Sequence, residues 1–435
     1  NEGINQDAAR SNFVWTYYYK FIQTANNVLS TINEETATDE QKGYIAAAKA
    51  FRALAYLDLG RMYEYLPTDV TKGVNADGND VTGLTVPIVK EGMAEADARN
   101  NPRVKKEDLI KFIKEDLEYA EQNIGKLTKT EKTLPHLDCV YGLEARLYMW
   151  EGDYAKAQAA AENAIKASSV QPMTQAQCLN TTTGFNNLAD FMWGSQQTSE
   201  DVVVSTGIVN WISFMCNEQT FGYCGAGTGD YIRIDTLAYN RLNDTDFRKL
   251  EWVAPAGSPI ANKVSFVNKT YGASMPPMAS VKFRPNQGEM DAPSVAAATA
   301  FPVMRVEEMY YIRMEAAAQQ DAAKGKELLE LFMKTRDPKY TCKATSKEDI
   351  IKEIYFQKCI DLWGEGITFF DMKRLNYSLT RGYHGTNHSV GARINTNGRP
   401  ATTNFLFYRT EAENNTALKG WNNPDPSGKY PLWTE

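Results

Sequence analysis

The clearest hydrophobic pattern in the chain lies between Gln41 and Pro67. Large apolar side chains recur there at steps of three and four residues, and alanines fill most positions between them. This spacing predicts one long helix with an apolar face, and the alanine methyls would let a second helix approach closely. Arg52, Asp58 and Arg61 are expected at or near the rim of that face. Pro67 is expected to stop the helix because proline lacks an N–H.

The same periodicity recurs in two groups of segments and predicts about eight helices in all. Thr38 is the expected N-cap of the helix described above, with Gln41 at the capping-box position. The other expected helices cover residues 12–32, a segment starting near Lys106, two short helices within 136–167, and residues 305–320, 322–336, 346–362 and 368–375.

Residues 136–167 resemble one tetratricopeptide (TPR) unit. Two short helices flank a turn at 151–153, and small residues recur where paired helices must nest. Tyr154 would fill the groove at the turn. The expected architecture is therefore a mainly α scaffold of TPR-like helical hairpins.

Helical periodicity disappears after residue 167 and returns near residue 301. Between them, Gly, Pro, Ser, Thr and Asn dominate, with short alternating pieces at 201–205 and 280–284 that predict strands. A long irregular stretch inside a compact protein usually carries function. We expect one domain over 1–435, with N-terminal TPR-like helices (12–167), an irregular ligand-binding part containing short β-strands (168–300), C-terminal TPR-like helices (301–376) and a loop-rich tail (377–435).

Composition excludes several classes of protein. The net charge of −7 and the lack of a basic stripe argue against nucleic-acid binding. The chain has no run of eighteen apolar residues, so no membrane-spanning helix is predicted. None of the six cysteines forms a CxxC pair, which argues against a thiolate zinc site. Cys216 and Cys224 are close enough in sequence to bridge a loop, but spacing alone does not show whether they do.

No enzyme is predicted. The chain has no G-x-S-x-G, P-loop or HExxH motif. Carboxylate pairs occur at Glu307–Glu308 and at Asp244 and Asp246, but a glycosidase needs two carboxyls about 5–9 Å apart across a cleft. The sequence does not supply that geometry.

No cofactor or metal is predicted. His384 and His388 are four residues apart, but Gly385 between them makes a helix doubtful, so a solvated loop is the preferred interpretation. The acidic turn at 77–80 could attract Ca²⁺, yet it lacks the full EF-hand pattern and a plain turn is preferred.

Binding of a sugar is the better hypothesis. Sugar rings stack on exposed aromatic rings, and their hydroxyls need polar partners. The segment from residue 190 to 275 supplies both kinds of side chain, although each aromatic could instead belong to the core. The candidate ligand-binding residues are Trp193, Trp211, Tyr223, Tyr231, Trp252, Tyr271, Asn210 and Arg233. Trp193 and Trp211 come first because Gly, Ser, Gln or Asn residues flank them, whereas Trp15 and Trp150 are expected to be structural.

Several segments, taken in order, resemble the SusD/RagB family of surface-exposed substrate-binding lipoproteins of Gram-negative outer membranes. The first matching helix keeps Phe51, Arg52, Ala53, Tyr56, Leu59, Tyr63 and Pro67; a later helix keeps Arg305, Glu308, Tyr310, Glu315 and Ala316; a third segment keeps Glu353, Leu362, Glu365, Gly366, Asp371 and Arg374. Shorter matches are VPIV at 86–89, IKEDLEYA at 113–120, NDTDFRKL at 243–250 and the closing PLWTE. The chain departs from the family at Ile354, Asp361 and Thr368, which puts a local charge network in doubt.

The resemblance implies a non-catalytic glycan-binding protein on the surface of the outer membrane. It would capture oligosaccharides and deliver them to a SusC-like TonB-dependent transporter, with the TPR-like helices packed on the transporter and the irregular part meeting the ligand. Such proteins carry a lipidated cysteine upstream of the position of Trp15, in a segment expected to be absent here. The alternatives are a peptide-binding protein like the RagB branch, or a TPR-type scaffold without a small ligand.

Overall fold

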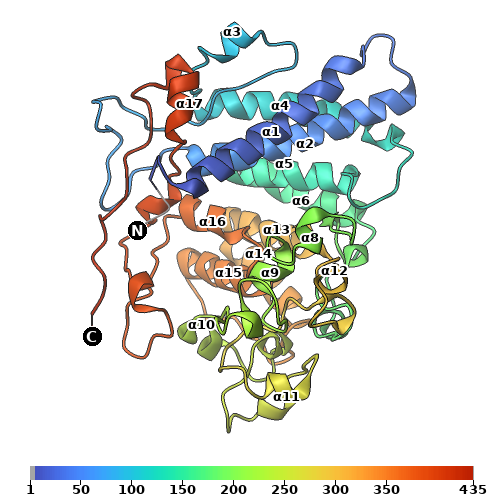
Figure 1. Ribbon diagram of the computed structural model, residues 1–435, viewed down its shortest axis with the longest axis vertical. Helices are drawn as coiled ribbons and strands as arrows, with labels where there is room; N and C mark the ends of the chain where they lie inside the picture. Colours follow the sequence, from blue (N-terminus) through green and yellow to red (C-terminus); the bar gives the residue numbers. More distant parts are fainter. Residues whose placement is uncertain (1–4, 435) are drawn as a thin grey trace.

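Long helices packed in consecutive pairs form the scaffold, and the computed structural model describes residues 5–434 of the chain (Figure 1). Eight helices of these described residues have twelve residues or more, and with the shorter helix at 368–374 they confirm the segments expected from periodicity. They are α1 (Ala9–Thr31), α2 (Asp39–Tyr63), α4 (Lys106–Asn123), α5 (Leu137–Glu151), α6 (Tyr154–Ala167), α13 (Val306–Gln320), α14 (Ala322–Met333) and α15 (Lys347–Asp361). Helix α13 packs on α6 and so joins the two groups.

The remaining elements are short and lie mostly in the irregular part. They are α3 (Glu95–Ala98), α7 (Gln175–Cys178), α8 (Val202–Ser205), α9 (Trp211–Met215), α10 (Thr236–Arg241), α11 (Lys269–Gly272), α12 (Pro293–Ala296), α16 (Thr368–Arg374), α17 (Arg409–Asn414) and the strands β1 (Trp193–Gln196) and β2 (Ala300–Met304). In Figure 1, α1, α2 and α4 lie in the upper half and α10 and α11 at the lower end.

Helix α2 lies at the centre of the largest hydrophobic core, as its pattern predicts. The Thr38 hydroxyl and the Gln41 side chain form the expected capping box. The helix ends at Tyr63, before Pro67. At that end Lys373 Nζ donates to the carbonyls of Arg61, Met62 and Glu64 at 2.8, 2.9 and 2.7 Å. This buried ammonium satisfies carbonyls that the helix itself leaves free.

The position expected for Arg52 was wrong. Its guanidinium is buried rather than at the rim, and it binds Asp116 of α4 with two hydrogen bonds of 2.7 and 2.8 Å. It also donates to Asn26 of α1 at 2.7 Å and pairs with Glu91 of the 68–104 loop. One side chain of α2 therefore ties together two helices and a loop, which the periodicity of α2 alone does not reveal.

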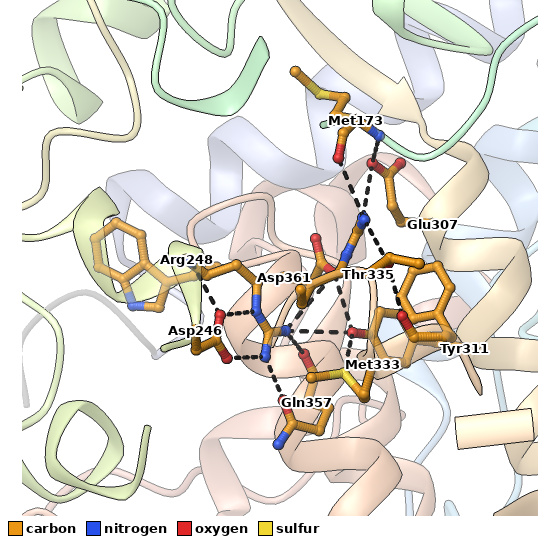
Figure 2. Close-up of polar contacts among 12 residues, drawn as sticks. Met173, Asp246, Arg248, Glu307, Tyr311, Met333, Thr335, Gln357 and Asp361 are labelled. Carbon is orange, nitrogen blue, oxygen red and sulfur yellow. Dashed lines mark hydrogen bonds and ion pairs between the residues drawn. The ribbon is translucent and has the colours of Figure 1, made fainter. Parts of the chain in front are cut away.

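A second buried charge network joins the irregular part to the C-terminal helices (Figure 2). Asp361 Oδ2 accepts hydrogen bonds from Arg336 Nε at 3.0 Å and from the Tyr311 hydroxyl at 3.1 Å. Arg248, from the irregular part, is held by Asp246 and Gln357 beside it. The departure from the family pattern at Asp361 thus leaves a network in place, and a shorter carboxylate serves as its centre.

Both strands expected in the irregular part were wrong. Residues 202–205 form helix α8, and residues 280–284 contribute one isolated bridge, between Trp252 and Ser280. Among the described residues the only sheet is the antiparallel pair β1–β2, in which Trp193 lies opposite Met304. Side-chain hydrogen bonds therefore replace regular ladders in this part.

All six cysteines are free thiols, and Cys224 Sγ donates to the Cys216 carbonyl at 3.0 Å.

Candidate functional site

The exposed aromatic surface of the irregular part is built on the short helix α9. The buried Asn210 side chain is the N-cap of this helix and accepts a hydrogen bond from Ser213 N at 2.8 Å. It also donates to the Val203 carbonyl at 3.1 Å. Asn210, a predicted ligand residue, therefore positions α9 and faces away from solvent.

Two aromatic rings lie parallel on the outer side of α9. The rings of Phe214 and Tyr223 have centroids 4.8 Å apart and an interplanar angle of 20°. Their side chains are 48% and 49% exposed. We call this pair the α9 platform. Tyr223 was predicted as a ligand residue, whereas Phe214 was missed.

The loop that carries Tyr223 rests on a rigid base of buried polar side chains. Tyr223 N donates to Ser213 O at 2.9 Å, which fixes the loop against α9. Asn217 donates to the carbonyls of Ile232 and Ser280 at 2.8 and 2.9 Å. Beside it, Glu218 forms a fully buried ion pair with Arg284. The platform is thus held in place before any ligand arrives, which lowers the entropic cost of binding.

Gly222 is required next to Tyr223. Its φ of +82° is one that side chains rarely adopt, and a Cβ there would lie 2.7 Å from the Cα of Ser213. The close approach of the loop to α9 therefore depends on this glycine.

Tyr231 and Tyr271 belong to the base of the platform. The Tyr271 hydroxyl donates to the Asn217 carbonyl at 2.8 Å and lies within hydrogen-bond distance of the Tyr231 hydroxyl, at 3.3 Å. Burial, followed by the hydrogen bond with Tyr231, raises the pKa of Tyr271 well above its ordinary value, so the hydroxyl stays a donor. Both predicted residues support the binding surface from behind.

Of the first choices from the sequence, Trp211 packs on strand β2 and Trp193 is the first residue of strand β1. The Trp211 ring stacks on Phe301 with centroids 5.2 Å apart and an angle of 15°, which holds α9 on β2. Trp193 is buried, and its indole N–H donates to the Thr133 carbonyl at 3.3 Å. Neither tryptophan presents the open ring face that the sequence led us to expect.

Trp252 and Arg233 are not part of the platform. The Trp252 ring is fully buried against Trp363, at 5.7 Å and nearly perpendicular, so it has no face for a ligand. Arg233 is exposed, and its guanidinium donates to the Asn387 carbonyl at 3.3 Å.

A second aromatic surface, which the sequence did not predict, is a cleft of about 1130 Å³ beside α1. We call it the α1 cleft; its walls include Phe13, Tyr17, Phe21, Trp193, Phe301 and Phe405. Phe13, Tyr17 and Phe21 recur every four residues along α1, a spacing that could have indicated a second apolar face.

The charged groups of the α1 cleft are largely satisfied within the protein. Arg146 Nε donates to Glu308 at 2.8 Å. Asp58 accepts from Tyr18 at 3.0 Å and from Arg61 at 2.6 Å. The cleft is therefore mainly an apolar surface, and its other charged groups are Arg10, Glu365 and Arg381.

The carboxylate pairs noted in the sequence do not form a catalytic site. Glu307 binds Arg305 and Glu308 binds Arg146, each at 2.7–2.8 Å and buried. Asp246 is likewise bound to Arg248.

Burial raises the pKa of the Cys224 thiol to about 12, which keeps it protonated and unreactive.

Within residues 5–434 no group of three His, Cys, Asp or Glu side chains could hold a metal ion. The 384–388 segment is a loop in which Gly385 has a φ of +80°. At 77–80, the Asp80 carboxylate accepts from Thr82 N at 2.9 Å, as in an ordinary turn. Across the same described residues, no helix is long and apolar enough to cross a membrane.

Two family models match the chain. A model described as starch-binding associating with outer membrane matches residues 1–149, and the model of the SusD family matches residues 228–424. Together they cover the N-terminal helical group up to residue 149, the C-terminal helical group and part of the irregular region. No curated protein matches the chain.

Solved structures of similar proteins share the fold. A SusD-like carbohydrate-binding protein from Bacteroides vulgatus is 19% identical with a TM-score of 0.71, covering 95% of this chain and 84% of that one. A SusD superfamily protein from Bacteroides thetaiotaomicron is 19% identical with a TM-score of 0.68, covering 93% and 84%. A laminarin-binding SusD-like protein is 16% identical with a TM-score of 0.61, covering 94% and 85%. At these identities the similarity shows the fold alone, and it agrees with the mainly α architecture predicted from the sequence.

Proposed function

Because the chain belongs to the SusD/RagB family, we propose that it captures oligosaccharides at the cell surface and delivers them to a SusC-like TonB-dependent transporter. The proteins of this family bind carbohydrate and are not catalytic. The α9 platform is the proposed contact surface for the glycan.

The parallel, half-exposed rings of Phe214 and Tyr223 are the observation that carries this proposal. The apolar face of a sugar ring can cover them and remove aromatic surface from water. Hydroxyls and a carboxylate on neighbouring exposed residues, such as Thr206, Thr228 and Asp230, can bind the sugar hydroxyls. An open platform also suits a chain that extends beyond the contact surface.

The outer-membrane location and the transporter partner rest on family membership. The long helices would supply the docking surface, because stacked helical hairpins present wide continuous faces. Affinity purification of a tagged form of this protein from cells that express it, followed by identification of the proteins that co-purify, tests the partnership. Recovery of this protein without any transporter would contradict it.

Peptide binding is the second candidate function, and the α1 cleft favours it. Its walls are mainly apolar, and the Arg146–Glu308 pair within it is already satisfied, which suits apolar side chains better than sugar hydroxyls. The two candidates thus use two different surfaces, which one pair of variants can separate.

Titration calorimetry against a panel of neutral and acidic oligosaccharides, with Tyr223→Ala and Tyr17→Ala variants, tests the proposal. Both tyrosines are about half exposed, at 49% and 54%, so neither substitution should unfold the protein. Loss of the ring contact at Tyr223 should cost about 1 kcal/mol, roughly fivefold in Kd. Tyr17→Ala should leave glycan affinity unchanged. No binding to any glycan, or weakening only by Tyr17→Ala, would overturn the proposed function or its site.

A further inference from the structure

We propose that the α9 platform selects neutral glycans and discriminates against glycans that carry carboxylate or sulfate groups. This inference rests on the proposed glycan-binding function and names its class of ligand. It follows from the charges of residues 167–232, which carry the platform, and of residues 285–304, which pack on its loop. The exposed cations Lys263 and Lys269 lie on the segment of Tyr271, behind the platform.

The segment that carries the platform contains no cation. Residues 167–232 include no Lys, Arg or His and are the longest such stretch in the chain. The same segment contains five acidic residues, of which Glu200, Asp201 and Asp230 are exposed.

The neighbouring segment, residues 285–304, also lacks Lys, Arg and His. It packs on the platform loop: Thr220 N donates to the Met290 carbonyl at 3.0 Å and the Thr220 hydroxyl donates to Asp291 at 2.7 Å. Asp291 is exposed and Glu289 is partly exposed, so this contact adds negative charge beside the platform.

The cations that lie beneath the platform are buried and already paired. Arg284 is bound to Glu218. Lys282 Nζ donates to Glu365 at 2.8 Å and to two backbone carbonyls. Both side chains are at most 1% exposed, so neither can reach a ligand on the outer surface. Arg233, the first cation after the gap, is exposed, and its guanidinium donates to the Asn387 carbonyl at 3.3 Å.

An anionic sugar would therefore lose more than it gains on this surface. A carboxylate or sulfate that leaves water needs a cation or several N–H donors, and carboxylate side chains supply neither. At physiological ionic strength, charges repel over about 8 Å, so Asp230 and Asp291 act on ligand groups near the loop. A neutral glycan meets no such penalty, and its hydroxyls can donate to these carboxylates.

Matched oligosaccharides test this inference on the intact protein. The probes are laminarin, xylan and galactan oligosaccharides, oligogalacturonate and its fully methyl-esterified form, alginate and chondroitin sulfate oligosaccharides. Binding should be confined to neutral members, with an acidic member at least tenfold weaker than its neutral counterpart. The difference should narrow as salt is raised. An acidic glycan that binds as tightly as the neutral ones would overturn the inference while leaving glycan capture intact. Absence of all binding would overturn both.

A charge-reversal variant separates local from global electrostatics. Asp230→Lys should improve binding of acidic glycans by about two- to fivefold at low salt, because it replaces repulsion with attraction. Glu348→Lys on α15 makes the same change in net charge at a side chain that is 77% exposed and serves as the matched control. Equal effects of the two variants would show that net charge alone sets the preference, and would overturn a role for the platform.

Discussion

The substitution Asp361→Asn tests the buried charge network that joins the irregular part to the C-terminal helices. Asp361 Oδ2 accepts from Arg336 at 3.0 Å and from Tyr311 at 3.1 Å, with Arg248 and Arg305 at 3.7 and 3.8 Å (Figure 2). Burial alone would raise the pKa of Asp361, but the three arginines outweigh it and hold this pKa well below its ordinary value. The carboxylate is therefore charged throughout the neutral pH range.

The size of the effect follows from the charges in the network. The cations and anions balance, with Lys282, Arg248, Arg305 and Arg336 on one side and Asp246, Glu307, Asp361 and Glu365 on the other. Asparagine leaves one buried positive charge without compensation, and such a change typically costs about 3–5 kcal/mol. The amide oxygen can keep one hydrogen bond, so we expect about 3 kcal/mol.

Urea unfolding followed by circular dichroism measures this loss. The folded-state pKa is lowered, so the stabilisation by Asp361 is present above the unfolded pKa and is lost as pH falls towards the folded pKa. The difference between wild type and Asp361→Asn should be full at pH 7 and smaller near pH 3. Glu348→Gln, in an exposed pair with Lys352, should change stability by less than about 0.5 kcal/mol. A loss below about 1 kcal/mol for Asp361→Asn at pH 7 would refute the reasoning.

Three further substitutions probe other buried polar groups. Lys373→Met leaves the carbonyls at the end of α2 without a donor, and urea unfolding should show a loss of about 2–4 kcal/mol in the free energy of unfolding. An unchanged urea midpoint would contradict the role of Lys373 as the cap of α2. Arg52→Met leaves the Asp116 carboxylate with Lys49, at 3.3 Å, as its cation and should cost about 3 kcal/mol in the same assay, whereas a loss under 1 kcal/mol would contradict the role of Arg52 as a tie between helices. Burial raises the pKa of Glu251 to about 7, so ionisation opposes folding as pH rises from about 4.5 to 7. Glu251→Gln should therefore gain up to about 3 kcal/mol on wild type between pH 5 and 8, and parallel pH profiles would contradict this.

The helical scaffold could be predicted from the sequence because apolar spacing and caps are local signals. Thr38 and Gln41 mark the start of α2 to the residue. Buried charges could not be placed, because the burial of Arg52 depends on Asp116, 64 positions away in the sequence. The two expected strands failed for a similar reason: alternation at 201–205 and 280–284 does not show whether a partner strand exists.

The candidate site was predicted only in outline. The irregular part does carry the exposed aromatic pair, and Tyr223 was selected from the sequence. Polar neighbours did not distinguish exposed from buried rings, because Trp193 and Trp252 are covered by segments distant in the sequence. Phe214 was missed since a helix as short as α9 gives no periodicity from which its outer face can be read. The cation-free stretch around it was visible in the sequence, but its meaning depends on which segments meet at the platform.

A crystal structure of the protein with a neutral oligosaccharide that binds in calorimetry is the most direct test of the central claim. We predict a sugar ring against Phe214 and Tyr223, with hydroxyls bonded to the loop around Asp230. A sugar located in the α1 cleft, with the α9 platform open to solvent, would contradict the account.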